Sequence, residues 1–589
     1  MKRKFVQIAA LCLAAALLLV SGGGKASAAA PAASNDRIIR VGLHYGTGAM
    51  EGLNFENAVG SGYRVGYFDS SNRFVQLGAI SQRTISVVKT VNVYYGTYSK
   101  YTSYHSVLTA SNVAVGEYHL QLPGSYASFA EAQAAAGAYA GGFPAYIGGV
   151  FYARVGNYTT RDKAVAAQSA LAAQGVSAAL AGTSEYGVSV VTTGTNTILF
   201  QFDDLGKGTG LGLAPGQGVA GEKPTTWSKD FLYYGSFRFE RINGGSLTVV
   251  NILGLEDYVK GVVPYEMSDS WPLEALKAQA VAARSYAVSL GTKHSSYHFD
   301  ICDSIHCQAY HGRERAGSNS DAAVDQTAGQ FALYNGKVAQ TSYYSSNGGA
   351  SESSSTVWGG NQANYPYLVG KPDPYEIAAN LSDDWTASFT SSTLASKLKG
   401  MGCDVGGGVA SITVASLTNS GNPNMVTFVG SNGKSYSLNS RDVVKMLGLR
   451  SYRYGFGAVA QTPASTAPTS SGVSVNGSGT VISTDGLYAI DGSGNVSAIG
   501  GDVYVITDSG TSQLKPDGGT AVPGGAAAGG SVSTQNSTTG SGGTFTFVGR
   551  GWGHNVGLSQ YGASAMAKMG YTYLDILQFY YTGITVGYM

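Results

Sequence analysis

The sequence is poor in cysteine and in charge. Its 589 residues include 4 cysteines, and charged residues make up 12% of the chain. One cysteine, Cys12, lies in the apolar N-terminal run, so the rest of the chain keeps three, and an odd number argues against a disulfide framework. The 37 basic residues nearly balance the 36 acidic ones, for a net charge of +1. This balance excludes a broad electrostatic surface for nucleic acid or anionic lipid, so recognition has to be local.

Glycine and tyrosine are abundant instead, with 83 and 39 residues. This composition is typical of chains rich in turns and in strands with half-exposed aromatic faces, as in many extracellular proteins. The length allows two to four domains of roughly 150 residues each. The chain is therefore long enough to bury a substantial core.

The N-terminus has the pattern of a secretory signal. Three basic residues at positions 2–4 precede an apolar run from Phe5 to Val20, and Ala26-Ser27-Ala28 supplies a small-x-small cleavage site. The run is shorter than the roughly 20 residues that span a bilayer core. We expect a cleaved signal peptide at 1–28 and a secreted, cell-wall location outside the cytoplasmic membrane. An uncleaved membrane anchor is the alternative.

An internal repeat with a period of roughly 35 residues lies at 117–197. Each copy has the pattern of a strand, an alanine-rich helix and a second strand. The pair resembles the SPOR domain, whose members bind glycan strands stripped of their peptides, and this resemblance implies a small ferredoxin-like module. Tyr152 and Tyr158 are candidates for stacking on sugars, although strand tyrosines are more often packing residues. A ferredoxin-like module without a ligand is the alternative.

Strand patterns surround this module, and a change of composition follows them. Short alternating runs fill 36–116 and resume after residue 186. Asn335-Gly336 between two apolar runs is the strongest short-range signal for a hairpin. At 458–543 the chain is rich in Ser, Thr, Gly, Pro and Ala. We predict a low-complexity insertion or flexible linker there.

A helix is predicted from Trp271 to Ser289, with Ser270 as N-cap and Pro272 in the first turn. Apolar residues at positions 273, 276, 280 and 283 share one face. The other face carries Lys277 and Arg284, nearly in line, and solvent is its simplest neighbour.

Glu266 lies just before this helix, among apolar residues at positions 262–264 and 267. Desolvation in such surroundings raises the pKa of a carboxyl group, which then holds a proton near neutral pH as a general acid requires. The alternative is a structural carboxylate, because helix starts attract negative charge.

Three segments resemble stage II sporulation protein D and the related amidase-enhancer proteins. They are 254–290, Tyr343-Tyr-Ser-Ser-Asn-Gly-Gly, and Gly549-Arg-Gly-Trp-Gly-His-Asn-Val-Gly-Leu-Ser-Gln-Tyr-Gly-Ala. The resemblance implies a peptidoglycan lytic transglycosylase acting on peptide-free glycan strands, with Glu266 at the position of the catalytic glutamate. Two residues depart from the family pattern. Tyr265 stands where a small residue is common, and Asn555 stands where glycine is usual.

The implied chemistry needs one carboxyl group. Glu266 donates a proton to the oxygen between N-acetylmuramic acid and N-acetylglucosamine, and then accepts the proton of the muramoyl C6 hydroxyl. That hydroxyl attacks C1 and closes a 1,6-anhydro ring. The sugar supplies its own nucleophile, whereas ordinary glycosidases use two carboxylates.

A second constellation of residues is typical of a structural zinc site. Two thiolates and two imidazoles within a short stretch match the ligands of a closed tetrahedral zinc, and the sequence here resembles a metal-binding loop of some family members. The candidate ligands are His298, Cys302, His306 and Cys307, with His294 as the alternative to His298. A disulfide between the two cysteines is the other interpretation.

Further polar residues are candidates for glycan binding. They are Lys277, Arg284, Ser345, Ser346, Asn347, His554, Gln560 and Tyr561. For Ser345 to Asn347, an ordinary capped turn is the alternative. The C-terminal group, which includes Ser559, either lines the groove or ties the C-terminus to the core, and the second is favoured.

We therefore expect an α+β fold, with a strand-rich domain like that of stage II sporulation protein D and a groove beside Glu266. The expected divisions are a signal peptide at 1–28, N-terminal strands at 36–116, the SPOR-like module at 117–197, the catalytic domain at 198–457, the insertion at 458–543 and a C-terminal part at 544–589. The rival function is a non-catalytic amidase enhancer that binds glycan and stimulates an N-acetylmuramoyl-L-alanine amidase. A structural wall-binding protein is a third possibility.

Overall fold

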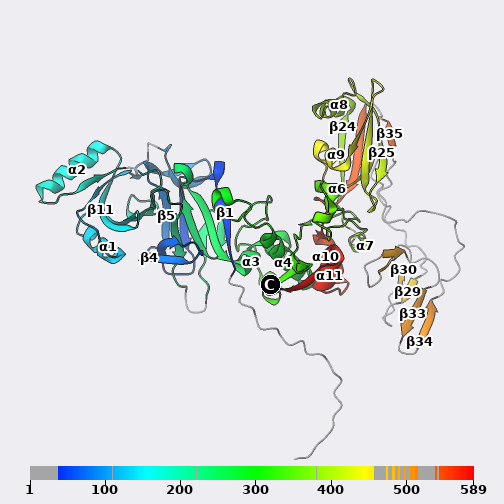
Figure 1. Ribbon diagram of the computed structural model, residues 1–589, viewed down its shortest axis with the longest axis horizontal. Coiled ribbons are helices and arrows are strands. Elements are labelled where there is room, and N and C mark those ends of the chain that lie inside the picture. Colours follow the sequence, from blue (N-terminus) through cyan, green and yellow to red (C-terminus); the bar gives the residue numbers. More distant parts are fainter. Residues whose placement is uncertain are drawn as a thin grey trace, which may run out of the picture. The chain divides into compact units, whose positions relative to one another are not determined.

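The computed structural model describes residues 37–589, with gaps at 109–110, 183, 219–221, 380 and 382 and at several stretches between 457 and 542. Strands and helices are mixed along the chain, which is the predicted α+β class (Figure 1). The expected signal peptide lies outside the described residues. Among the described residues, no helix is both long and apolar enough to cross a membrane.

A seven-stranded sheet carries the segment that leads to Glu266. Its order is β20-β1-β19-β18-β15-β3-β4. The strands are β1 (Ile38–His44), β3 (Tyr63–Phe68), β4 (Phe74–Ile80), β15 (Leu211–Pro215), β18 (Ser236–Glu240), β19 (Thr248–Gly254) and β20 (Ile301–Cys302). β1 pairs antiparallel with β19, with Ile38 opposite Gly254. The first described strand therefore supports the strand that runs directly into the helix ending at Glu266.

A ten-stranded sheet has the order β12-β9-β11-β10-β14-β13-β5-β2-β16-β17. Its strands are β2 (Gly52–Asn57), β5 (Thr84–Lys89), β9 (Tyr118–Gln121), β10 (Gly142–Ile147), β11 (Val150–Tyr158), β12 (Ala179–Ala181), β13 (Val188–Thr192), β14 (Ile198–Asp203), β16 (Thr226–Ser228) and β17 (Phe231–Tyr233). A separate sheet joins β6 (Val93–Tyr98), β7 (Tyr101–His105) and β8 (Ala114–Val115).

The sequence repeat forms one end of the ten-stranded sheet. Helices α1 (Phe129–Gly137) and α2 (Arg161–Ala173) alternate with β9, β10, β11 and β12. Their N-caps are Ser128 and Thr160, whose side chains accept backbone N–H bonds. The strand order β12-β9-β11-β10 and the β-α-β-β-α-β sequence are those of a ferredoxin-like unit. Each repeat copy thus folds as strand, helix and strand.

Helices α3 (Leu255–Glu266), α4 (Leu273–Ser289) and α5 (Ser318–Gln326) pack together beside the first sheet. The predicted helix corresponds to α4, but it begins at Leu273 after Pro272, and the Ser270 hydroxyl lies near that of Ser268. Eleven of the seventeen residues of α4 are buried. The expectation of a solvent face opposite the apolar face is therefore wrong.

Arg284 shows why that face is buried. Its side chain is fully buried, and its Nε and Nη2 donate to the Glu256 carboxylate at 2.9 and 2.6 Å. It also donates to the carbonyl oxygen of Gln330 at 3.1 Å. Glu256 accepts a further bond from the Gly329 amide at 3.0 Å. Arg284 therefore joins the start of α3 to α4 and to the strand that begins at Gln330.

The predicted hairpin is present between β21 (Gln330–Tyr334) and β22 (Lys337–Val338). Asn335 and Gly336 have φ values of 50° and 75°, which a tight hairpin turn of this type requires. β38 (Thr585–Tyr588), near the end of the chain, pairs with the other side of β21.

The C-terminal third contains a second core. It is built from α8 (Ser391–Gly400), α9 (Ser440–Leu447), β24 (Asp384–Thr390), β25 (Val409–Leu417), β26 (Pro423–Gly430), β27 (Ser435–Asn439), β28 (Arg453–Phe456) and β36 (Thr544–Arg550). β36 lies between β24 and β28. The chain thus leaves this sheet at Phe456 and returns to it at Thr544.

Short elements complete the described structure. The helices are α6 (Ser354–Trp358), α7 (Pro374–Ala378), α10 (Gln560–Lys568) and α11 (Tyr573–Tyr580), with short 3-10 segments at Gly46–Gly48, Ile242–Gly244, Ser295–Tyr297 and Gln362–Asn364. β23 (Tyr343–Tyr344) pairs with β37 (Leu558–Ser559). Most of the predicted insertion lies outside the described residues. Its described strands are Gly472–Ser474, Val481–Ser483, Tyr488–Ile490, Val496–Ala498, Val503–Thr507, Gly510–Leu514 and Ser537–Thr539.

Replacement of Arg284 tests the buried ion pair. We expect Arg284→Met to lower the free energy of unfolding by about 3 kcal/mol, because it leaves the Glu256 carboxylate without its cation. Lys277→Ala on the same helix is the matched control. Its partially exposed pair with Glu274 contributes less than about 1 kcal/mol. Chemical denaturation measures both, and equal losses would contradict this account.

Candidate active site

Glu266 is the last residue of α3, a helix that the sequence reasoning did not predict. Gly261 and Pro264 lie inside this helix, and both disfavour helix formation. Packing explains the glycine, because a Cβ at position 261 would lie 2.5 Å from Cε2 of Tyr310. Pro264 is in the last turn, and the Met267 amide closes that turn on Val263 at 2.9 Å. Tertiary packing therefore overrides propensity here.

The Glu266 carboxyl accepts hydrogen bonds from two remote side chains. Tyr343 donates its hydroxyl to Oε1 at 3.2 Å, and Gln560 donates Nε2 to Oε2 at 3.1 Å. Burial raises the pKa of Glu266, and the bonds from Gln560, from the Ala309 backbone and from Tyr343 offset part of this rise. Glu266 is thus a desolvated acid with fixed orientation, as a proton donor requires.

A cavity of about 580 Å³ opens beside this carboxyl group. Its walls are lined by Glu266, Tyr286, Ile305, Cys307, Gln308, Ala309, Gln340, Ser342, Tyr343, Tyr344, Ser345, Trp358, Trp552, Gly553, His554 and Gln560. Trp358 and Trp552 are 43% and 57% exposed. The cavity therefore combines one acid with two accessible aromatic faces.

His554 contributes a neutral ring to the cavity. Its Nδ1 accepts the Val556 amide at 3.1 Å, so the proton of the neutral ring is on Nε2. Burial lowers the pKa of His554 to about 4. The ring packs edge-on against Tyr344 and Trp358, with centroids 5.4 Å away in each case. It is therefore a hydrogen-bonding group without charge at neutral pH.

The predicted polar loop is only partly at the cavity. Ser345 lines it, whereas Ser346 and Asn347 are buried. Asn347 donates to Asp373 at 2.8 Å, and its backbone amide donates to Glu376 at 2.6 Å. Asn347 therefore holds the loop in place rather than facing the cavity.

The other predicted glycan-binding residues lie elsewhere. Lys277 forms an ion pair with Glu274 at 2.7 Å. The guanidinium of Arg284 is occupied by its bonds to Glu256 and to the backbone. Neither lines the cavity. Tyr561 is 40% exposed and packs on Trp271 with ring centroids 5.0 Å apart, next to the cavity residue Gln560. Ser559 is buried and donates to the Glu376 carboxylate.

Four residues of the second constellation converge on one point. The ligand atoms of His294, Cys302, His306 and Cys307 all lie within 4.8 Å of one another. Cys307 Sγ is 3.4 Å from His294 Nε2, and Cys302 Sγ is 3.7 Å from His306 Nδ1. Tetrahedral zinc with ordinary bond lengths separates its ligands by about 3.6 Å, so the donor set fits this ion. No disulfide joins Cys302 and Cys307 in this structure.

His298, the first choice of the sequence reasoning, is not part of this cluster. Its Nδ1 bonds instead to Glu240 Oε1 at 2.8 Å. His294 takes the fourth place.

The matched family profile is described as Stage II sporulation protein and covers residues 243–334. This segment contains α3, α4, Glu266 and the histidine-cysteine cluster. A stage II sporulation protein D of Bacillus subtilis is 25% identical over 352 residues, which are 57% of this chain and 75% of that protein. The central part of this chain is therefore similar to the stage II sporulation protein D family.

Two further relatives are similar to this chain over smaller fractions of their own length. An amidase enhancer of Bacillus subtilis is 32% identical over 329 residues, which are 56% of this chain and 40% of the enhancer. An uncharacterized protein of Brachyspira hyodysenteriae is 45% identical over 139 residues, 23% of this chain and 37% of that protein. The chain thus spans less than half the length of these two relatives.

The two departures from the family pattern have physical explanations. Asn555 has a φ of 61°, a left-handed conformation that favours glycine and that asparagine tolerates. Its Nδ2 also donates to the Asn347 carbonyl at 3.1 Å. Tyr265 points away from the acid next to it, because its hydroxyl donates to the His311 carbonyl at 3.0 Å. Neither residue disturbs Glu266.

Four cavity residues with a clear contact or an exposed ring were not among the sequence candidates. Tyr343 touches the acid, and Gln308 donates to the Tyr343 hydroxyl at 2.9 Å. Trp358 and Trp552 supply the exposed rings. Tyr343 and Trp552 lie inside the segments that carried the resemblance, which was the available signal. Gln308 lies inside the loop that resembles a metal-binding loop of some family members, whereas Trp358 has no such signal.

We propose that the histidine-cysteine cluster holds one structural zinc ion. We expect about one zinc per purified chain by elemental analysis. We also expect a lower melting temperature after chelation, because bound metal stabilises the folded state. Cys307→Ser should lose the metal, whereas Cys403→Ser, outside the cluster, should keep it. A metal-free chain with Cys302 and Cys307 protected from alkylation would instead indicate a disulfide.

Proposed function

We propose that this protein is a lytic transglycosylase that cleaves the bond between N-acetylmuramic acid and N-acetylglucosamine in peptide-free peptidoglycan strands. The observation that carries the proposal is that Glu266 is the one carboxylic acid among the described residues lining its cavity. Hydrolases of glycosidic bonds generally need two carboxyl groups. A single protonated acid suits a reaction in which the substrate supplies the nucleophile.

The mechanism assigns both proton transfers to Glu266. The protonated acid gives its proton to the glycosidic oxygen as the bond to C1 breaks. The resulting carboxylate then takes the proton of the muramoyl C6 hydroxyl as that oxygen bonds to C1, which yields a 1,6-anhydro end and restores the acid. Because the attacking hydroxyl belongs to the same sugar, its high effective concentration replaces an activated water.

The remaining cavity residues suit a neutral saccharide. Trp358 and Trp552 present rings on which sugar faces stack. Tyr343 and Gln560 orient the acid, and His554 is uncharged. Apart from Glu266 and the cluster residue Cys307, no described residue of the cavity wall has an acidic or basic side chain that is charged at neutral pH. Strands without charged stem peptides are therefore the favoured substrate.

The ferredoxin-like unit is assigned a supporting role. Its strand order agrees with the SPOR-like reading, and in this proposal it binds peptide-free glycan and keeps the protein on the wall. The protein then acts outside the cytoplasmic membrane, in cell-wall remodelling or sporulation.

A second candidate function is favoured by one finding. The Bacillus subtilis relative that is 32% identical carries the name amidase enhancer. In this alternative the cavity binds glycan without cleaving it, and the protein stimulates an N-acetylmuramoyl-L-alanine amidase. An acid with a raised pKa has no task in that role, so we rank the transglycosylase first.

Product analysis separates the two functions. We expect the purified protein to release 1,6-anhydromuramoyl ends from peptide-free glycan, detected by mass spectrometry. Glu266→Gln removes the transferable proton and should abolish these products. Glu314→Gln, at an exposed position outside the cavity, should retain them. Glycan binding without cleavage by the wild type would support the enhancer role.

The pH dependence of cleavage tests the acid directly. Activity requires protonated Glu266, so kcat/KM should fall as pH rises through the raised pKa of this group. Gln560→Leu removes a bond that favours the carboxylate, and the alkaline limb should therefore move up by about one pH unit. Lys568→Ala, exposed on the same helix, should leave the limb in place. A limb unaffected by Gln560→Leu would exclude Glu266 as the titrating group.

A further inference from the structure

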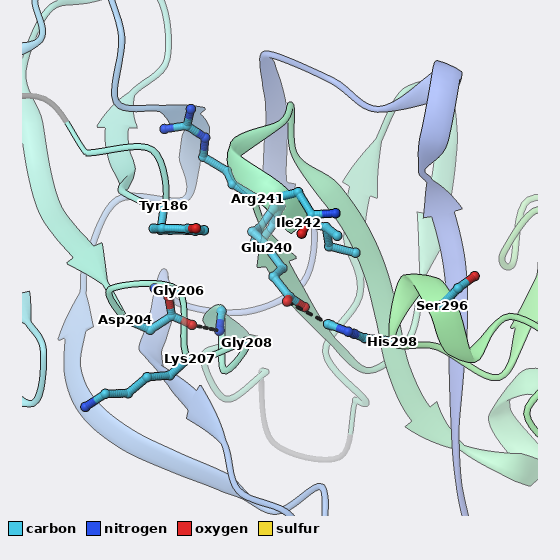
Figure 2. Close-up of a pocket in the computed structure, with 13 residues that line it drawn as sticks. Tyr186, Asp204, Gly206, Lys207, Gly208, Glu240, Arg241, Ile242, Ser296 and His298 are labelled. Carbon is cyan, nitrogen blue, oxygen red and sulfur yellow. Dashed lines mark hydrogen bonds and ion pairs between the residues drawn. The ribbon is translucent and has the colours of Figure 1, made fainter.

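A second cavity shares no lining residue with the Glu266 cavity. It lies where the loop between β14 and β15 meets the end of β18 and the turn that ends at His298. Its volume is about 340 Å³, whereas a water molecule occupies roughly 30 Å³. Figure 2 shows Glu240 and His298 bonded to each other on one side of it, with Tyr186 and Asp204 on the other side. The space is large enough for a ligand with a ring.

Glu240 provides a buried acceptor without a partner. The residue is 6% exposed, and its Oε1 is bonded to His298 Nδ1 at 2.8 Å. Its Oε2 accepts no hydrogen bond from any described residue, and Arg238 Nη2 is 3.9 Å away. Buried polar atoms almost always have partners, so this oxygen marks a place for a donor.

His298 is held in an uncommon conformation beside this acceptor. Its φ is 61°, a left-handed conformation that is uncommon outside glycine and that asparagine, aspartate and histidine adopt more often than other residues. Arg238 donates to its carbonyl oxygen, and Glu240 fixes its ring. Since Nδ1 is engaged with Glu240, Nε2 is the ring nitrogen left for a ligand, and the side chain is 46% exposed. Residues held in this way cluster at functional sites.

The opposite wall is a preformed loop. The Asp204 carboxylate accepts the amides of Gly206, Thr209 and Gly210 at 3.0, 2.7 and 3.0 Å. Between them, Gly208 has a φ of 73°, and a Cβ there would lie 3.4 Å from Glu240 Oε1. The loop is thus fixed by its own aspartate, and glycine keeps the approach to Glu240 open.

The charges around the cavity favour a neutral ligand. The Arg241 guanidinium donates to the carbonyl oxygens of Ser184 and Gly245 at 2.8 and 3.0 Å. Together with Arg238 and Lys207 it offsets the two carboxylates on the wall. The cavity therefore offers acceptors without excess negative charge, which suits hydroxyl and amide N–H donors better than an ammonium group.

The geometry does not suit catalysis. Figure 2 shows Ser296 pointing away from His298, so the His298–Glu240 pair has no hydroxyl to activate. Binding is the remaining role.

We propose that this cavity is a second saccharide site, which takes one neutral N-acetylated sugar ring. The sugar's hydroxyl or acetamido N–H donates to Glu240 Oε2 and His298 Nε2, and Tyr186 forms the aromatic wall. We choose a glycan strand as the source of this sugar because the proposed function acts on such strands. A strand that occupies both cavities is bound at two places, and only the Glu266 cavity carries out the reaction.

Two histidines report separately on the two cavities. The chain has eight histidines, and His298 and His554 each line one cavity. We would titrate tri-N-acetylglucosamine into the full chain labelled with ¹³C-histidine and follow both ring signals by NMR. His298→Asn and His554→Asn identify the signals, and asparagine tolerates the left-handed conformation at position 298.

The expected result is a saturable shift of the His298 signal in the wild type and in Glu266→Gln. Tyr186→Ala and Glu240→Gln should each weaken this binding about tenfold, the effect of losing one good contact. Lys434→Ala is the control, because this exposed residue lines neither cavity, and it should bind like the wild type.

Three outcomes would overturn the proposal. A shift of His554 without His298 would leave the proposed function intact and remove the second site. A His298 signal that responds to free lysine but not to the sugar would make the ligand an amine. If neither histidine responds to the sugar, the second site fails together with the glycan-binding part of the proposed function.

Discussion

The buried pairing of Arg284 with Glu256 is the contact on which the Glu266 site depends. It fastens the first turn of α3 to the middle of α4, and the same guanidinium reaches the backbone where β21 begins. Glu266 lies at the other end of α3, so the direction of that helix decides where the acid points. Strand β19 continues directly into α3, so the sheet fixes the position where the helix begins. A charge buried far from the reacting atoms therefore determines the position of the acid.

The acid is completed by residues from distant parts of the chain. Tyr343 is 77 residues away in sequence, and Gln560 is 294 residues away. A second buried carboxylate, Glu376, brings these segments together, because it accepts the amides of Asn347 and Gly348 and the hydroxyl of Ser559. Burial and the neighbouring Asp373 raise its pKa to about 8. The cavity thus needs polar interactions in the core as much as apolar packing.

Local signals in the sequence predicted local structure well. Asn335-Gly336 fixed a turn through its positive φ angles, and the apolar spacing found α4. The same spacing misassigned Arg284, because a pattern identifies one buried face but not what covers the other. His298 and His294 were alternatives for the fourth ligand, and the left-handed turn at His298 directs its ring to Glu240 instead. Glu266 was found through its apolar neighbours, but the bond that it accepts from Tyr343 is a tertiary contact that no local pattern encodes.

β36 and α10 come late in the sequence, which matters while the chain is being synthesised. A ribosome makes the chain from its N-terminus, so Glu266 exists long before Trp552, His554 and Gln560 are synthesised. A chain that ends before this segment carries the acid and Trp358 but lacks Trp552 and the amide that orients the carboxyl group. The Glu266 cavity is therefore complete only after the segment that contains Gln560 has been synthesised.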